Sequence, residues 1–191
     1  MPNEGGIYRN CPVMIYDSNS GTLIIRAVIT AHYMSEMVIV VSDEMKEVER
    51  GTRLSLLIIY DGGVSECNGI ARGFFDGTRE ITLFNERQRE GRSATRHVLN
   101  ASAVIRSLFV DSLRHPYQPP LEVVIENISS SGALIVTAVM EFDIDNVLEL
   151  NTDIGGHSAA LFAKVARKQV ISDSVIGLGC YFIFPEQSAG E

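Results

Sequence analysis

Val38-Ile39-Val40-Val41 and Ala133-Leu134-Ile135-Val136 are two short apolar runs that lie 95 residues apart, and their recurrence decides the fold. Runs of this length and composition favour β-strands over amphipathic helices. The same offset places Ile70-Ala71-Arg72 on Val165-Ala166-Arg167. Slightly different offsets superimpose two further pairs of segments, Leu54-Ser55-Leu56 on Leu148-Glu149-Leu150 and Asp61-Gly62-Gly63 on Asp153-Ile154-Gly155-Gly156. The sequence therefore predicts an internal repeat of two halves built on one plan.

Each half contains about six such runs, bounded by the Gly, Asp and Asn residues typical of turns. The expected strands of the first half are Pro12–Tyr16, Thr22–Thr30, Met37–Ser42, Arg53–Tyr60, Gly69–Phe75 and Glu80–Phe84. Those of the second half are Ala101–Phe109, Leu121–Asn127, Gly132–Val139, Asn146–Asn151, Ala159–Gln169 and Gly177–Phe184. One helical turn is expected at Met45–Arg50. The predicted fold class is all-β, with two tandem small antiparallel β barrels of about six strands each, because closure removes exposed strand edges.

The composition bounds the function. Of the 191 residues, 46% are hydrophobic and 21% are charged, which is enough apolar material for a folded core. The net charge of −8 argues against a nucleic-acid binder and against a partner for anionic membranes, so an anionic ligand must be captured by a local basic cluster.

The cysteines and the apolar segments indicate the cellular location. Cys11, Cys67 and Cys180 are odd in number, far apart and without a CxxC pair, which favours reduced thiols over a disulfide frame or a zinc site. No signal peptide is recognisable, and the apolar runs are too short to span a bilayer. A cytoplasmic location without membrane insertion is therefore expected.

The segment between the two sets of strands, residues 85–97, is the most polar and most arginine-dense part of the chain. The predicted domains are accordingly an N-terminal barrel at 1–85, an Arg-rich linker at 86–97 and a second barrel at 98–191. A guanidinium fork binds phosphate bidentately and stacks on a purine face, and the spacing of Arg92 and Arg96 lets both approach one ligand. The alternative is an ordinary solvated linker.

A second polar feature, Asn127-Ile128-Ser129-Ser130-Ser131-Gly132, lies at a predicted turn between two strands. Asn and Ser offer donors and acceptors suited to the edge of a base, and a glycine permits close approach of a ligand or of the backbone. The alternative is a plain hairpin turn, which uses the same residue types.

Together the two features resemble the signature of the PilZ family, whose members bind cyclic di-GMP. That signature is Arg-x-x-x-Arg just before the first barrel strand, followed by Asp/Asn-x-Ser-x-x-Gly after the second. Arg92 and Arg96 directly precede the strand expected at Val98–Phe109. The second element is matched, in the expected order, by Asn127, Ser129 and Gly132. The segment Gly177–Phe182 is also similar to the glycine-rich closing strand of the family, so the resemblance covers roughly residues 87–185.

The resemblance implies a ligand site for cyclic di-GMP. Arg92 and Arg96 would clamp the phosphates and contact the guanines, while Asn127 and Ser129 would read a guanine edge and Gly132 would shape the turn. Arg89, together with Arg87, and Gly179 are secondary candidates outside the motif. The chain departs from the family where Gly91 precedes the first motif arginine, which leaves the ligand stoichiometry open, and it is too short after Phe184 for the C-terminal helix of many members.

The first half has the strand pattern without the motifs. At the position of the second motif it carries residues 32–37, His-Tyr-Met-Ser-Glu-Met, and no Arg-x-x-x-Arg precedes its first strand. It resembles the accessory barrel of two-domain flagellar-brake-type PilZ proteins, or a degenerate PilZ repeat, and an interaction role is expected for it.

Catalytic and metal chemistry have no support in the sequence, so we expect neither an enzyme nor a bound cofactor. His32, His97, His115 and His157 are scattered without zinc-ligand spacing, and no nucleophile elbow or phosphate loop is present. The leading hypothesis is a bacterial signalling receptor that binds cyclic di-GMP, changes its inter-domain geometry and acts on a downstream protein partner. A PilZ-like adaptor that binds only protein is the alternative, a nucleic-acid-binding barrel is disfavoured, and a homodimer stays open.

Overall fold

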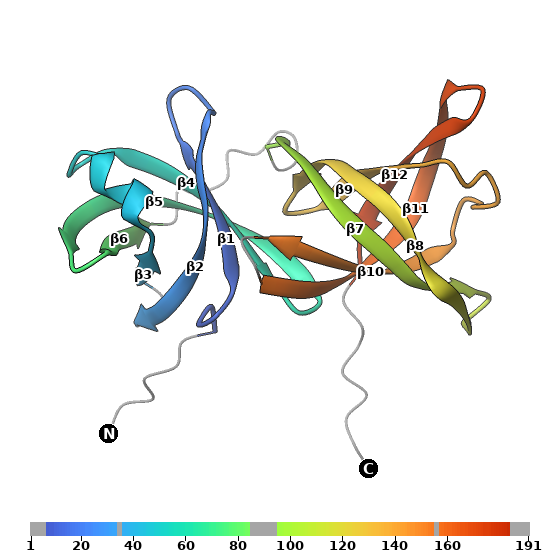
Figure 1. The fold of residues 1–191 in the computed structure, drawn as a ribbon, viewed down its shortest axis with the longest axis horizontal. Coiled ribbons are helices and arrows are strands. Elements are labelled where there is room, and N and C mark those ends of the chain that lie inside the picture. The colour runs from blue at the N-terminus through green and yellow to red at the C-terminus, as the bar shows by residue number, and fades with distance from the viewer. Residues whose placement is uncertain (1–6, 34–35, 85–94, 155–156, 184–191) are drawn as a thin grey trace, which may run out of the picture. The chain divides into compact units, whose positions relative to one another are not determined.

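The computed structural model describes residues 7–33, 36–84, 95–154 and 157–183. Within these ranges the chain forms twelve β-strands and one short 3-10 helix, and none of them contains an α-helix (Figure 1). The strands form two closed six-stranded barrels whose neighbouring strands pair antiparallel. The predicted fold class is thus confirmed.

The first barrel has the strand order β1-β2-β3-β6-β5-β4, and the 3-10 helix η1 (Asp43–Glu47) lies between β3 and β4. Its strands are β1 (Pro12–Asp17), β2 (Leu23–Tyr33), β3 (Met37–Val41), β4 (Arg53–Tyr60), β5 (Gly63–Phe75) and β6 (Thr78–Phe84).

The second barrel has the order β7-β8-β9-β12-β11-β10, which is the first order with six added to each label. Its strands are β7 (His97–Val110), β8 (Leu113–Ser129), β9 (Gly132–Thr137), β10 (Val147–Ile154), β11 (His157–Ser172) and β12 (Val175–Phe182). The chain divides into two compact units, one with residues 1–60, 64–93 and 154–157 and the other with 61–63, 94–153 and 158–191.

The repeat extends to individual irregularities of the backbone. The register shift between Ile29 and Ala31 in β2 recurs between Ile125 and Asn127 in β8. Each barrel also has a left-handed asparagine near the beginning of its first strand: Asn10, with φ 62°, lies just before β1, and Asn100, with φ 47°, lies within β7. These pairs are 96 and 90 residues apart, so turns of different length explain why no single offset aligns the two halves.

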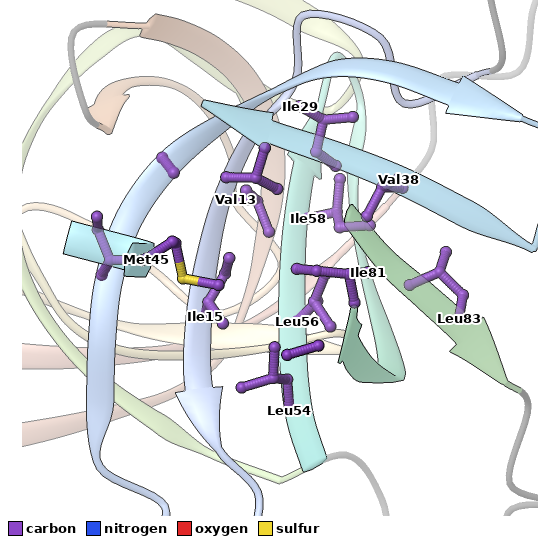
Figure 2. Close-up of a cluster of buried hydrophobic side chains, with 14 residues drawn as sticks. Val13, Ile15, Ile29, Val38, Met45, Leu54, Leu56, Ile58, Ile81 and Leu83 are labelled. Carbon is purple, nitrogen blue, oxygen red and sulfur yellow. The ribbon is translucent and has the colours of Figure 1, made fainter. Parts of the chain in front are cut away.

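The core of the first barrel is filled by side chains that alternate inward along its strands. Val13 and Ile15 of β1 meet Leu54, Leu56 and Ile58 of β4, and all five are fully buried (Figure 2). Met45 of η1 packs against the same cluster and is also fully buried, so η1 contributes an apolar plug. In the second barrel a fully buried Phe142 lies in the corresponding connection, between β9 and β10.

A buried guanidinium holds η1 in place. Arg79 of β6 is only 3% exposed. Its Nη2 donates to the Met45 carbonyl at 2.6 Å and also to the Val48 carbonyl, while its Nη1 donates to the Arg72 carbonyl at 2.7 Å. The guanidinium carbon of Arg79 also lies over the Phe74 ring, 5.2 Å from the ring centroid. These bonds give the Val48 carbonyl a donor at the end of η1, and they add a donor to the Met45 carbonyl, which also accepts from the Val48 N–H at 3.3 Å.

Replacing Arg79 with alanine should therefore remove the side-chain donor from the Val48 and Arg72 carbonyls and one of the donors of the Met45 carbonyl. We expect Arg79→Ala to lower the free energy of unfolding of the first barrel by about 2–4 kcal/mol, measured by urea denaturation. Arg72→Ala is the matched control, because the exposed Arg72 side chain makes one hydrogen bond, to Thr82 Oγ1. Equal stability of the two variants would contradict the structural role of Arg79.

His32 of β2 is a buried histidine whose ring nitrogens have no hydrogen-bond partner among the described residues. Its side chain is 4% exposed and stacks on Tyr8, with the ring centroids 4.8 Å apart. Burial lowers the pKa of His32 below its ordinary value of 6.5, because the charged ring would be desolvated without a compensating partner.

The lowered pKa makes the stability of the protein pH-dependent. Below pH 6.5 the unfolded chain binds a proton that the folded chain resists, so stability contributed by His32 is lost as the pH falls below that value. We expect the wild type to lose more stability than His32→Phe between about pH 7.5 and pH 5.5, measured by urea denaturation at each pH. His115→Gln serves as the exposed control and should follow the wild type; parallel pH profiles for the wild type and His32→Phe would refute the assignment.

Two sequence expectations need correction. The strands expected at Ala101–Phe109 and Leu121–Asn127 leave residues 110–120 as a connecting segment, which includes the proline-rich residues 115–120, but the latter lie within β8, which begins at Leu113. The turn is at Asp111-Ser112, both with positive φ, as in tight hairpins. Residues 117–120 are accommodated in a register irregularity, because Leu121 pairs with Ile105 and Pro116 pairs with Ser107. His97, placed in the linker by sequence, is the first residue of β7 and is buried.

Candidate functional site

Three segments of the second barrel meet at the start of β7. His97 pairs with Ile128, Val98 pairs with Asn127, and Ser129 pairs with Gly132 across the β8–β9 turn. Arg96 directly precedes His97 and is exposed. The pairing therefore brings Arg96 beside the end of β8, where the second motif lies. Arg92, Arg89 and Arg87 lie outside the described residues.

Strand alternation separates the inside of the barrel from the outside in this region. The inward row runs across five strands and is at most 8% exposed; it consists of His97, Ile128, Ala133, Cys180 and Val165. Burial raises the pKa of the Cys180 thiol to about 12, so this sulfur is a neutral packing group at physiological pH.

The outward row next to it is called the site strip. Successive Cα partners across β7, β8, β9, β12 and β11 define it as Val98, Asn127, Leu134, Gly179 and Arg167. A second outward row contains Ser129, Gly132, Tyr181 and Lys164, and the alternation places Arg96 on its side of the barrel. Arg96, Asn127, Gly132 and Gly179, all predicted site residues, thus belong to one outer face.

Asn127 offers free hydrogen-bonding groups on this face. Its side chain is partly exposed, and no described residue forms a hydrogen bond with its carboxamide. The amide therefore presents a donor and an acceptor to solvent, which is what recognition of a base edge requires.

Ser129 has a different local role. It is 5% exposed, and its hydroxyl donates to the Gly132 carbonyl at 3.2 Å and accepts from the Ser131 backbone N–H at 3.3 Å. These bonds form the turn itself, so the hairpin interpretation describes Ser129 in this structure. A direct contact between Ser129 and a ligand remains a prediction.

Gly132 is required by the close approach of β9 and β12. A Cβ atom at this position would lie 2.1 Å from the Cys180 carbonyl oxygen and 2.9 Å from the Tyr181 Cα. Both obstructing atoms belong to the backbone of a paired strand and cannot move aside. The motif glycine is therefore explained by packing within the barrel.

We expect Gly132→Ala to destabilise the second barrel strongly. Relieving the overlap must separate β9 from β12, so we expect the variant to lose about 3 kcal/mol or more of unfolding free energy, or to fail to fold. Gly73→Ala in β5 is the control, since its nearest neighbour would be 4.0 Å from the added Cβ. A Gly132→Ala protein as stable as Gly73→Ala would show that the strands are not so close.

The cations of the second barrel differ in what they contact. Arg114 pairs with Glu149 at 2.8 Å, and Lys164 pairs with Asp145 at 2.9 Å. Lys168 Nζ donates to the Met140 carbonyl, and Arg106 faces the Asn151 amide, which accepts from its Nε in the orientation that satisfies both groups. Arg96 and Arg167 have no hydrogen-bond or ion-pair partner among the described residues of this barrel.

The second barrel also has a pocket whose lining contains none of the site-strip residues. It has a volume of about 700 Å³ and is lined by residues of all six strands, both exposed ones such as Ser102 and Val124 and buried ones such as Ala103, Thr137 and Thr152. No group of three metal-ligating side chains occurs among the described residues, and no helix in them could cross a membrane.

The first barrel differs at every matched position of the site. Ala31 and Tyr33 occupy the places of Asn127 and Ser129 in the strand register, and Met37 occupies that of Gly132. Counting back from the left-handed asparagines, Gly6 and Pro2 stand in the sequence where the second repeat has Arg96 and Arg92. The first repeat therefore lacks the cations, the amide and the small residues.

Comparison with known proteins gives structural likenesses only. No family model matches the chain, and no curated protein matches it. Among solved structures, it is similar to MrkH of K. pneumonia in complex with c-di-GMP, with 16% identity, a TM-score of 0.38 and coverage of 92% of this chain and 80% of that one. It is also similar to the inhibitor of motility MotI/DgrA of Bacillus subtilis, with 13% identity, a TM-score of 0.35 and coverage of 95% and 91%.

A further similar structure is YcgR of Escherichia coli in complex with c-di-GMP, with 8% identity, a TM-score of 0.35 and coverage of 91% and 76%. The likeness is to PilZ-domain proteins. Identities of 8–16% and TM-scores of 0.35–0.38 assign neither a family nor a residue's role to this chain.

Proposed function

We propose that this protein is a cyclic di-GMP receptor that binds its ligand on the outer face of the second barrel. The observation that supports the proposal is the pairing of Val98 with Asn127. Arg96 comes two residues before Val98, so this pair supports a position for Arg96 near the Asn127 amide, although they are 31 residues apart in the sequence. The pairing therefore supports a shared site for Arg96 and the second motif.

The chemistry of the face suits a dianionic dinucleotide. Guanidinium forks of Arg92 and Arg96 would bind the phosphates and stack on guanine faces. The free Asn127 amide would form hydrogen bonds with a guanine edge. The tight Ser129–Gly132 turn would leave room above the barrel surface for the base. Because the whole chain carries a net charge of −8, these local cations are what would attract an anion.

Binding and release need no covalent chemistry, so the proposed role is that of a receptor. We propose that the arginines before β7, by closing over the ligand, change the geometry between the barrels and present a new surface to a downstream protein. The first repeat, which lacks the site residues, would serve interaction rather than ligand binding. The alternative, an adaptor that binds only protein, keeps the same fold and differs in having no nucleotide affinity.

Calorimetric titration with cyclic di-GMP tests the proposal. We expect Arg92→Ala and Arg96→Ala each to weaken binding roughly 10- to 100-fold, the loss of a charge-assisted contact worth about 1.5–3 kcal/mol, and Asn127→Ala to weaken it about tenfold. Arg114→Ala is the matched control, since Arg114 is engaged with Glu149. Small-angle scattering of the same samples measures whether the inter-barrel geometry changes on binding.

The outcomes separate the two functions. Absence of any heat and of any thermal shift with cyclic di-GMP would favour the adaptor. Wild-type affinity in both arginine variants would refute the assigned clamp, and unchanged scattering on saturation would refute the coupling between ligand and inter-barrel geometry.

A further inference from the structure

Arg167 is an arginine outside both motifs that the barrel places in the site strip. It pairs with Gly179 across β11 and β12, and Gly179 pairs in turn with Leu134, the partner of Asn127. We infer that Arg167 is a further ligand-contacting residue, which binds the half of the dinucleotide that Asn127 does not reach. This inference rests on the proposed function.

The side chain of Arg167 lies across Gly179. A Cβ atom built on Gly179 would be 2.6 Å from Arg167 Cγ and 2.5 Å from its Nε. The arginine thus occupies the space that any side chain at position 179 would need. Because Gly179 has no side chain, the Arg167 side chain can lie along the barrel surface over the site strip instead of projecting into solvent.

The charge of Arg167 is available for a ligand. Its side chain is exposed, and within the described ranges it has no carboxylate or carbonyl partner. The nearby Lys164 and Lys168 are already engaged by Asp145 and by the Met140 carbonyl. Arg96 and Arg167 are therefore the uncommitted cations of the described second barrel, and they lie toward opposite ends of the same outer face.

The spacing fits a ligand with two bases. Asn127 and Gly179 are separated by two strand intervals, which is about 10 Å at the usual 4.7–4.9 Å per interval. Leu134 lies between them and provides an apolar floor. One guanine would pair with the Asn127 amide, and the planar Arg167 guanidinium would stack on the face of the other.

Four variants test the inference by calorimetric titration with cyclic di-GMP. We expect Arg167→Ala to weaken binding about tenfold, in the range of a desolvated cation–π contact. Arg167→Lys should restore little, because it keeps the charge and loses the planar group. Gly179→Ala should weaken binding similarly by displacing the flexible Arg167 side chain, and Arg167→Ala/Gly179→Ala should bind no more weakly than Arg167→Ala alone. Arg114→Ala is the charge-matched control and should bind like the wild type.

Each result bears on the inference. Wild-type affinity in Arg167→Ala would overturn it while leaving the proposed function intact. Full affinity in Arg167→Lys would overturn the stacking contact, since charge alone would then suffice. Additive losses in the double variant would overturn the claim that Gly179 acts through Arg167. Absence of binding by the wild-type protein would overturn the proposed function and this inference together.

Discussion

The two-residue alternation of a closed barrel is the constraint on which the site depends. One register along β7, β8, β9, β12 and β11 turns His97, Ile128 and Cys180 toward the core. The same register turns Asn127, Gly179 and Arg167 toward solvent. A shift of one residue in any of these pairings would exchange the two sets. Burial of the core row therefore fixes the composition of the outer face, so that stability and the proposed ligand recognition depend on the same register.

The strands and the repeat could be predicted because they follow from local composition. Short β-branched runs between Gly, Asp and Asn leave few alternatives to strands, and two similar sets of them indicate duplication. The motif residues could be found because their spacing is local. Arg167 was missed as a site residue because its relation to Asn127 runs through three strand pairings that no single segment of sequence contains. The closing Gly-x-Gly was the available signal.

Other features could not be predicted from the sequence because a residue type occurs in an environment that is unusual for it. Arg79 would be assigned to the surface by its charge, yet it is 3% exposed and binds carbonyls at the end of η1. The prolines before Leu121 lie in a segment outside the expected strands, but a register irregularity in β8 accommodates them. The two repeats diverged at corresponding places: Arg79 stands where the second barrel has Leu178, and Ala31 stands where it has Asn127.

The close approach of the β9 and β12 backbones at Gly132 has a consequence for how the second barrel could transmit a signal. Because β9 and β12 are in close backbone contact and the barrel is closed, no strand can shift its register without breaking its hydrogen bonds to both neighbouring strands. The second barrel is therefore expected to be rigid, and it would not transmit ligand binding through a change of its own conformation. Under the proposed function, ligand binding on its outer face would therefore be signalled through the segments attached to the barrel, above all the chain that enters β7.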